Sequence, residues 1–167
     1  MLPQRLGKIR RERCLQLMYQ RALILILCFL FTACSNTVSV RVSNIEKSNL
    51  NNRLDDVPVT LIIYKLKNIE KFKEASEKDL ITREDGVLGK DKIDSIKLQI
   101  APKNEILALK LQDKEIPYLG ILTLFTNNTS RTTKIWVKTK DASGFWSGLL
   151  RKKTLTFEIT QEGIKRI

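Results

Sequence analysis

The side chains that most often carry out chemistry in enzymes are scarce in this sequence. It contains no histidine, and its three cysteines are Cys14, Cys28 and Cys34. Because no histidine and no further cysteine follow Cys34, that region can build neither a His/Cys zinc site nor a Ser-His-Asp or Cys-His catalytic arrangement. We therefore expect no metal and no cofactor, and Cys34 is the thiol there that is open to covalent modification.

Two pairs of neighbouring acids, Asp55-Asp56 and Glu84-Asp85, are the next candidates for chemistry. Acid/base catalysis needs opposed groups in a pocket, and a calcium site needs several oxygen ligands. Neither pair has such companions nearby in the sequence, so we interpret both pairs as solvated loop charge. Together with the lack of a nucleophile motif, this predicts a protein that is not an enzyme and has no small-molecule substrate.

The surroundings of Cys34 indicate export. Basic residues precede the apolar run ALILILCFL at 22–30, and Thr32 and Ala33 are small residues before the cysteine. This order is typical of a helical signal peptide, and the run is shorter than the ~20 apolar residues of a membrane span. A plain membrane anchor is the alternative. The sequence FTACS also resembles the lipobox of bacterial lipoproteins, whose cysteine is acylated and becomes the new N-terminus.

We accordingly predict a signal peptide over 1–33, a lipid on Cys34 and one domain over 34–167. Starting at Met18 gives a leader of ordinary length, which we favour over a long basic start from Met1. Ser35 follows the cysteine, and the sorting rule of enteric bacteria then implies the periplasmic face of the outer membrane; a host without that rule leaves the inner membrane open. Several acyl chains would anchor the protein stably, whereas a single chain binds reversibly.

Short strands separated by turn signals fill the rest of the chain. Val38, Val40 and Val42 alternate with polar residues, and the same period of two recurs at Leu107, Leu109 and Leu111. The expected strands cover 37–42, 57–65, 94–100, 106–111, 118–125, 133–140 and 154–160. Asn68 can cap a short helix with an apolar stripe at Ile69, Phe72, Ala75 and Leu80. The pattern predicts a mainly β fold, an antiparallel β-sandwich with a short helical insertion.

One candidate binding surface is the long polar loop Ser43 to Asp56. Ile45, Leu50 and Leu54 are isolated apolar residues that could either seat in pockets of a partner or pin the loop to its own domain. Loops on rigid sandwiches commonly recognise partners. Because the loop is so polar, we expect that a short linker could replace it without unfolding the domain.

The second candidate surface is one face of the strand expected over 133–140. Lys134, Trp136, Lys138 and Lys140 alternate there, as in a basic stacking platform for nucleic acid or in an edge strand protected by lysines. Export disfavours a nucleic-acid partner. Residues 34–167 keep 24 basic and 17 acidic residues, a formal charge of +7, which favours an acidic protein or an anionic polymer instead. Phe145 and Trp146 follow in a glycine-flanked turn that could touch lipid headgroups or a partner, or plug the sandwich.

The order of these segments resembles the TssJ family, the outer-membrane lipoproteins of type VI secretion systems. The stretches that carry the resemblance are TVSVRVSN, DVPVTLIIYKLKN, IEKFKEASEKDL, KLQIAPKNEILALKL and IPYLGILTLFTNN, followed by Trp136. Tyr118-Leu119-Gly120 is the most specific piece. Two features depart from the family: the usual tryptophan-arginine pair is Trp136-Val137 here, and the proline-rich end of the loop is reduced to Pro58.

The resemblance implies a transthyretin-like sandwich that acts as a lipid-anchored structural component of a type VI secretion membrane complex. Its partner would be the periplasmic domain of a TssM-like inner-membrane protein, bound through the loop between the first two strands. The implied contact residues are Ile45, Leu50, Asn51, Asn52, Arg53, Leu54 and Asp55. The face with Lys134, Trp136, Lys138 and Lys140 is a possible secondary surface. The alternative is an envelope lipoprotein that binds an anionic polymer or ligand through this basic face.

Overall fold

The computed structural model describes residues 37–112, 115–127, 130–145 and 152–167. The chain divides into two compact units, Met1–Ser35 and Asn36–Ile167, and the description below concerns the second. The expected signal peptide, Cys34 and Trp146 lie outside the described residues. Within the described ranges, no helix has both the length and the apolar character needed to cross a membrane.

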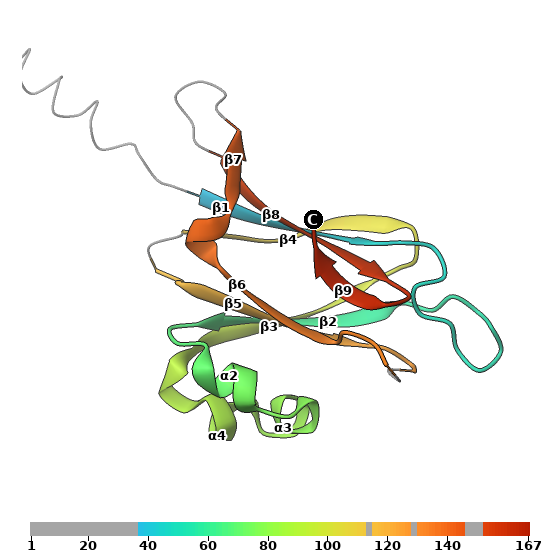
Figure 1. The fold of residues 1–167 in the computed structure, drawn as a ribbon, viewed down its shortest axis with the longest axis horizontal. Coiled ribbons are helices and arrows are strands. Elements are labelled where there is room, and N and C mark those ends of the chain that lie inside the picture. The colour runs from blue at the N-terminus through green and yellow to red at the C-terminus, as the bar shows by residue number, and fades with distance from the viewer. Residues whose placement is uncertain (1–36, 113–114, 128–129, 146–151) are drawn as a thin grey trace, which may run out of the picture. The chain divides into compact units, whose positions relative to one another are not determined.

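Two sheets packed face to face form the domain (Figure 1). The first sheet has the order β4-β1-β8-β7, with β9 also paired to β8, and the second has the order β3-β2-β5-β6. The first contains β1 (Thr37–Asn44), β4 (Asn104–Gln112), β7 (Ser143–Phe145), β8 (Lys152–Thr160) and β9 (Gly163–Arg166). The second contains β2 (Val59–Leu66), β3 (Lys92–Ile100), β5 (Tyr118–Leu124) and β6 (Lys134–Lys138). The mainly β sandwich is confirmed, with β7 and β9 as additional strands.

The sandwich departs from a purely antiparallel arrangement at its centre. Strands β1 and β8 run parallel, with Val40 opposite Leu155 and Val42 opposite Phe157, while the other strand pairs of the described sheets are antiparallel. The alternation that predicts a strand is the same for either direction of pairing, and β1 and β8 are too far apart in sequence for a hairpin to impose one. The expectation of an all-antiparallel sandwich is corrected at this pair.

A bulge in the first sheet changes which residues of β4 face the core. The register between β1 and β4 shifts between Val40 and Arg41, which lie opposite Leu109 and Leu107. A bulge places an extra residue on one strand and so reverses the facing of the residues beyond it. As a result Ile106 packs against the core, whereas Leu107 is 46% exposed. The predicted inward position of Leu107 is wrong.

Two clusters of apolar side chains hold the layers together. Between the sheets, Val38 and Val40 of β1 and Phe157 of β8 pack with Leu61 and Ile121 of the second sheet. Strands β2 and β5 are also apolar on their outer faces, because this side of the sheet is covered by helices. In a strand that is buried on both faces, apolar and polar residues do not alternate. This explains the continuous apolar runs of β2 and β5.

The helical insertion consists of several short pieces rather than one helix. They are α2 (Glu70–Glu74), α3 (Glu77–Thr82), α4 (Glu84–Leu88) and the 3₁₀ turn η1 (Gly89–Asp91). Ser76 breaks the run, because its hydroxyl accepts a hydrogen bond from Asp79 N at 3.1 Å and starts α3. The predicted stripe Ile69, Phe72, Ala75 and Leu80 is buried as expected.

The helices are fixed to the sheet by a buried tyrosine. The Tyr64 hydroxyl donates to the Leu80 carbonyl at 2.9 Å, and its ring lies 5.5 Å from the ring of Phe72. Burial, followed by the nearby Glu84 carboxylate, raises the pKa of Tyr64. The raised pKa favours the protonated hydroxyl, which is the form that donates this hydrogen bond.

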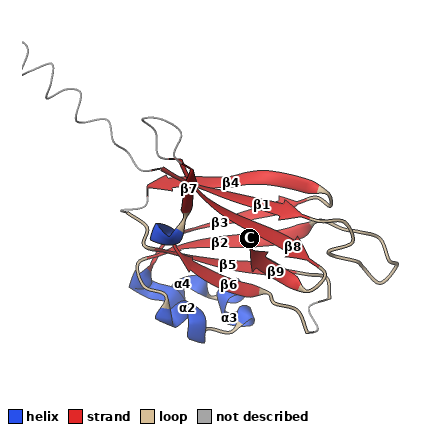
Figure 2. Cartoon of the chain, turned by 45° about the horizontal axis from the view of Figure 1, so that its top comes forward, coloured by secondary structure: helices blue, strands red, loops and turns tan. Residues whose placement is uncertain are grey.

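The sandwich has two distinct ends, which Figures 1 and 2 show from different sides. At the entry end, β1 begins at Thr37, opposite Gln112 of β4 and Lys152 of β8, and β5 begins beside the end of β6. At the loop end, β1 finishes at Asn44 and the chain enters the segment 45–58 that leads to β2. The segment 45–58 and the first residue of β1 therefore lie at opposite ends of the domain.

Candidate functional site

The candidate partner loop begins and ends two residues later than predicted from the sequence, because β1 extends to Asn44 and β2 begins at Val59. Ser43 and Asn44 belong to β1, and Asn44 is buried, with its amide donating to the Ile100 carbonyl of β3 at 3.0 Å. The Ser48 hydroxyl donates in turn to the Asn44 amide oxygen. These contacts tie the start of the loop to both sheets, so the loop proper comprises 45–58.

Asn49 anchors the base of the loop from inside the protein. Its amide nitrogen donates to the Pro58 carbonyl at 3.0 Å, and its amide oxygen accepts from Thr126 N at 2.8 Å. Arg131 adds a hydrogen bond to the Ser48 carbonyl at 2.8 Å. Because unsatisfied buried polar groups cost ~1–3 kcal/mol each, replacing all of Ser43–Asp56 would disturb the fold. We expected that a short linker could replace all of Ser43–Asp56 without unfolding the domain. This expectation is corrected: it holds for the tip of the loop alone.

The tip of the loop is an ordered turn. Leu50 and Asp56 form an isolated antiparallel bridge, and Asn51 closes the turn between them. The Asn51 side-chain oxygen accepts from Arg53 N at 2.8 Å and from Asp55 N at 2.9 Å, which leaves Leu54 in a left-handed conformation with a φ of 66°. The Asp56 carboxylate accepts from Lys47 N at 2.6 Å. A turn held in this way presents its side chains in a fixed direction.

The apolar residues of the loop could either seat in pockets of a partner or pin the loop to its own domain. The exposed fractions of the predicted contact residues distinguish these two interpretations. Leu54 is 77% exposed and Ile45 is 37% exposed, so neither is held firmly in its own domain. Leu50 is half-buried in the bridge and helps to shape the turn. Asn52, Arg53 and Asp55 are exposed around Leu54, and Asn51 is half-buried. The structure thus brings the predicted contact residues 50–55 together at one tip, with Leu54 as its apolar centre.

The second candidate surface is not the single basic face that the sequence suggested. The Lys134 amine donates to the carbonyl oxygens of Phe72 at 3.1 Å, Lys73 at 2.9 Å and Ala75 at 2.6 Å. It therefore caps the carboxyl end of α2, where a cation is favoured by the helix dipole. Burial lowers the pKa of Lys134, against an opposing effect of the Glu77 carboxylate. Lys134 holds the helices to β6 and is not available to a polymer or partner.

Trp136 and Lys140 also differ from the single basic face that was predicted. Trp136 is 40% exposed, and the Lys73 amine from α2 lies 4.4 Å from the centre of its ring in a cation–π contact. Strand β6 ends at Lys138, and Lys140 lies in the 3₁₀ turn η2 (Thr139–Asp141). The strand ends there because Thr139 N donates to the Pro117 carbonyl at 3.0 Å. Lys140 therefore does not share a strand face with the other three residues.

The acid pair Glu84-Asp85 is bound to a lysine of β3. The Lys92 amine lies 2.5 Å from Glu84 Oε1 and 2.7 Å from Asp85 Oδ1, and its side chain is only 13% exposed. Burial lowers the pKa of Lys92, but the hydrogen bonds with Asp85 and Glu84 outweigh it and raise the pKa overall. The interpretation as solvated loop charge is corrected for Glu84, which is 28% exposed and helps to clamp α4 to the start of β3, whereas the Asp85 side chain is 86% exposed to solvent.

Comparison with known protein families shows to which family this sequence belongs. Residues 36–162 match the family model described as type VI secretion lipoprotein, with the member names VasD, EvfM and TssJ. The chain belongs to the type VI secretion lipoprotein family. Members of this family are structural lipoproteins of a secretion system, and no catalytic activity is known for them. No curated protein matches the sequence at a significant level.

Solved structures show that this family member has the TssJ fold. The lipoprotein TssJ1 of Pseudomonas aeruginosa aligns with a TM-score of 0.67 and 17% identity, covering 80% of this chain and 96% of that one. Lip of Serratia marcescens, a membrane-bound component of the type VI secretion system, aligns with a TM-score of 0.67 and 16% identity over 80% and 97%. A structure described as the TssM C-terminal domain from EAEC contains a chain that aligns with a TM-score of 0.64 and 15% identity over 78% and 99%.

Proposed function

We propose that this type VI secretion lipoprotein is anchored by lipid on Cys34 at the periplasmic face of the outer membrane. There it would bind the periplasmic domain of a TssM-like inner-membrane protein through the tip 50–55. The observation that carries the proposal is the position of Leu54, which is 77% exposed on an ordered turn. This turn lies at the end of the sandwich opposite the first residue of β1 (Figure 1).

Chain connectivity relates this arrangement to the membrane. Thr37 follows Cys34 by three residues, which can span at most ~10 Å. A lipid on Cys34 would therefore keep the entry end of the sandwich close to the bilayer. The eight residues of β1 extend over roughly 25 Å and end at the loop. The tip would then face away from the outer membrane, toward a partner that reaches across the periplasm.

The tip also has the chemistry of a binding centre. An exposed leucine surrounded by Arg53, Asn52 and Asp55 resembles the apolar centre and polar rim of protein interfaces. The hydrogen bonds of Asn51 hold the backbone in place before binding, so little conformational entropy remains to be lost when a partner docks.

We expect Leu54→Asp to weaken binding of the TssM-like periplasmic domain by roughly 30-fold or more, because truncating a central apolar contact typically costs ~2 kcal/mol or more and a buried charge costs further. Isothermal titration calorimetry with the purified domain measures this loss. Leu107→Asp is the matched control, since Leu107 is also exposed but lies on β4, away from the tip. Unchanged affinity of a folded Leu54→Asp variant would move the interface elsewhere, first to the surface around Trp136.

We expect Cys34→Ala to abolish incorporation of a palmitate analogue, because no later cysteine can accept the lipid. Metabolic labelling followed by purification of the protein measures this directly. Cys28→Ala is the control, since Cys28 lies in the expected signal peptide and its loss should leave labelling unchanged. Equal labelling of Cys34→Ala and the parent would exclude Cys34 as the lipid site.

A further inference from the structure

A small pocket at the entry end combines basic side chains with an aromatic ring. It lies between the start of β5 and the end of β6 and has a volume of about 250 Å³. The described residues that line it are Pro117, Tyr118, Lys138, Thr139 and Lys140. Two of these carry a positive charge and none carries a negative one. Among the described residues, no ion pair involves Lys138 or Lys140. Within the described part of the chain, the charge that lines the pocket is therefore entirely positive.

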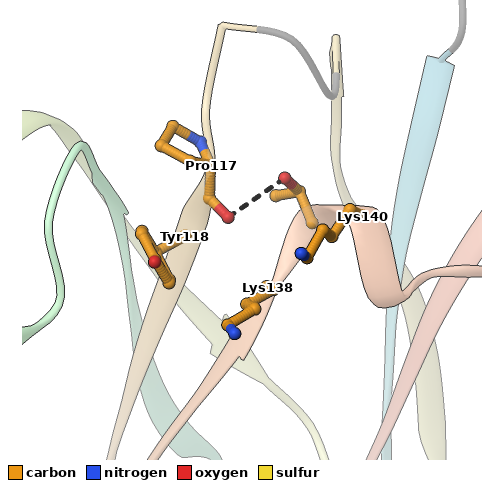
Figure 3. A pocket seen from close by; sticks show the side chains of 5 residues that line it. Pro117, Tyr118, Lys138 and Lys140 are labelled. Carbon is orange, nitrogen blue, oxygen red and sulfur yellow. Dashed lines mark hydrogen bonds between the residues drawn. The ribbon is translucent and has the colours of Figure 1, made fainter.

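The walls of the pocket are held in place by hydrogen bonds. Tyr118 and Lys138 lie directly opposite each other in the β5–β6 pair. The buried Thr139 hydroxyl donates to the carbonyl oxygens of Ile116 at 2.5 Å and Pro117 at 3.2 Å. Figure 3 shows the side chains of Tyr118, Lys138 and Lys140 around the pocket, and its dashed line marks a hydrogen bond accepted by the Pro117 carbonyl. The lysines thus extend from a rigid frame rather than from a mobile loop.

The pocket adjoins the point where the chain enters the domain. Ile116, which accepts the Thr139 bond, lines a neighbouring hollow together with Thr37, the first residue of β1. That neighbouring hollow has a mixed charge, because Lys65, Lys110 and Glu115 line it. Its Lys65 is paired with Asp94 at 2.8 Å. The pocket of Lys138 and Lys140 differs in that all the charged residues described in its lining are basic, and it lies next to the entry of the chain.

We infer that this pocket binds the phosphate group of an anionic phospholipid headgroup in the membrane that anchors the protein. Lysine amines are compact charges that suit phosphate, and anionic membrane surfaces attract lysines near them. The volume is below the ~300–1,000 Å³ of sites for drug-sized ligands but accommodates a headgroup. The inference rests on the proposed lipid anchor at Cys34, because only that anchor holds the entry end at the membrane. Bound headgroups would fix the orientation of the sandwich and so direct the tip 50–55 away from the bilayer.

Lysine labelling on the acylated protein tests this inference. The protein is reconstituted in nanodiscs of phosphatidylcholine, with or without phosphatidylglycerol, and acetylation of each lysine is quantified by mass spectrometry. We expect labelling of Lys138 and Lys140 to fall at least threefold when phosphatidylglycerol is present. Lys78 and Lys97, which are exposed on α3 and β3, should change little. Equal labelling of Lys138 and Lys140 in both discs, on acylated protein, would overturn the pocket assignment alone.

Two further measurements separate the other outcomes. The intact mass of the same sample reports acylation, and unacylated protein would overturn both the anchor and this inference. Protection of Lys138 and Lys140 in detergent by millimolar inorganic phosphate, equal to that by phosphatidylglycerol, would show a free-anion site and overturn the lipid assignment. If inorganic phosphate does not protect the two lysines, the result supports the assignment of the pocket to a phospholipid headgroup.

A charge-matched pair of variants completes the test. The immobilised fraction of spin-labelled phosphatidylglycerol, compared with spin-labelled phosphatidylcholine, gives the lipid preference of each variant. We expect Lys138→Gln/Lys140→Gln to reduce this preference by roughly 10- to 30-fold, as for the removal of two lysines at an anionic surface. Lys78→Gln/Lys97→Gln, with the same change in net charge, should retain it. Equal preferences of the two folded double variants would overturn the inference.

Discussion

Gly163→Ala is expected to destabilise the protein by about 3–5 kcal/mol, because this position combines a forbidden backbone conformation with a clash. Its φ is +120°, where residues with a side chain rarely lie. A Cβ atom there would meet the Thr132 carbonyl oxygen at 2.1 Å and the Thr132 nitrogen at 2.5 Å. Both obstacles are backbone atoms, so no side-chain rotation can relieve the contact.

The close approach at Gly163 closes one side of the sandwich. Thr132 N donates to the Glu162 carbonyl at 2.9 Å, and Ile164 N donates to the Thr132 carbonyl at 2.8 Å. These bonds join β9 of the first sheet to the segment that precedes β6 of the second. The preceding residue, Arg131, reaches the base of the partner loop through the Ser48 carbonyl. Loss of the hydrogen bonds around Thr132 would therefore destabilise both the packing of the two sheets and the base of the loop that carries the tip.

Thermal and urea unfolding of the full-length protein measures the effect of Gly163→Ala, with an expected fall of the melting temperature by more than about 10 °C. Gly86→Ala is the matched control. Gly86 lies in α4 with no atom within 4 Å of an added Cβ, so alanine should be neutral or stabilising there by up to ~1 kcal/mol. A Gly163→Ala protein that melts with the parent would show that the approach of β9 to Thr132 is not as close as described.

Much of this architecture was predictable from the sequence, because burial on one face of a strand leaves a period of two. The alternation at Val38, Val40 and Val42 therefore located β1 correctly. The short strand β9 was missed, since its four residues at the end of the chain are too few to show a period. The parallel pairing of β1 with β8 could not be predicted, because it depends on contacts between distant segments rather than on either pattern.

The candidate site was predictable in its position but not in its detail. An apolar residue within a polar loop is a readable signal, and Leu54 is indeed exposed at the tip. Asn49 has the same polar character as its neighbours, yet it is buried, because its amide satisfies backbone groups of other segments. Lys134 shows the same limit, since a lysine that caps a helix looks like a solvated one until the helix is placed beside it. Polarity alone therefore does not distinguish a binding residue from a structural one.

Gly120→Ala is expected to destabilise the protein by about 1–3 kcal/mol through overpacking. An added Cβ would meet the ring atoms of Phe72 at 2.7 Å, so the ring lies directly on the backbone of β5. The ring cannot withdraw easily, because Lys134 holds the carbonyls of α2 and the Tyr64 ring packs beside it. This contact gives a physical reason for glycine in the sequence Tyr118-Leu119-Gly120.

A double variant decides whether this contact is the cause. Phe72→Leu alone should cost roughly 1–2 kcal/mol by leaving a partly filled space. In Gly120→Ala/Phe72→Leu, the smaller side chain makes room for the added methyl group. The double variant should therefore be more stable than the sum of the single effects predicts, by about 1 kcal/mol in urea unfolding. Strict additivity would mean that the cost at Gly120 arises from the strand itself and not from the helix packed on it. Because the tip 50–55 is remote from this contact, affinity for the TssM-like domain should be retained in the folded fraction of each variant.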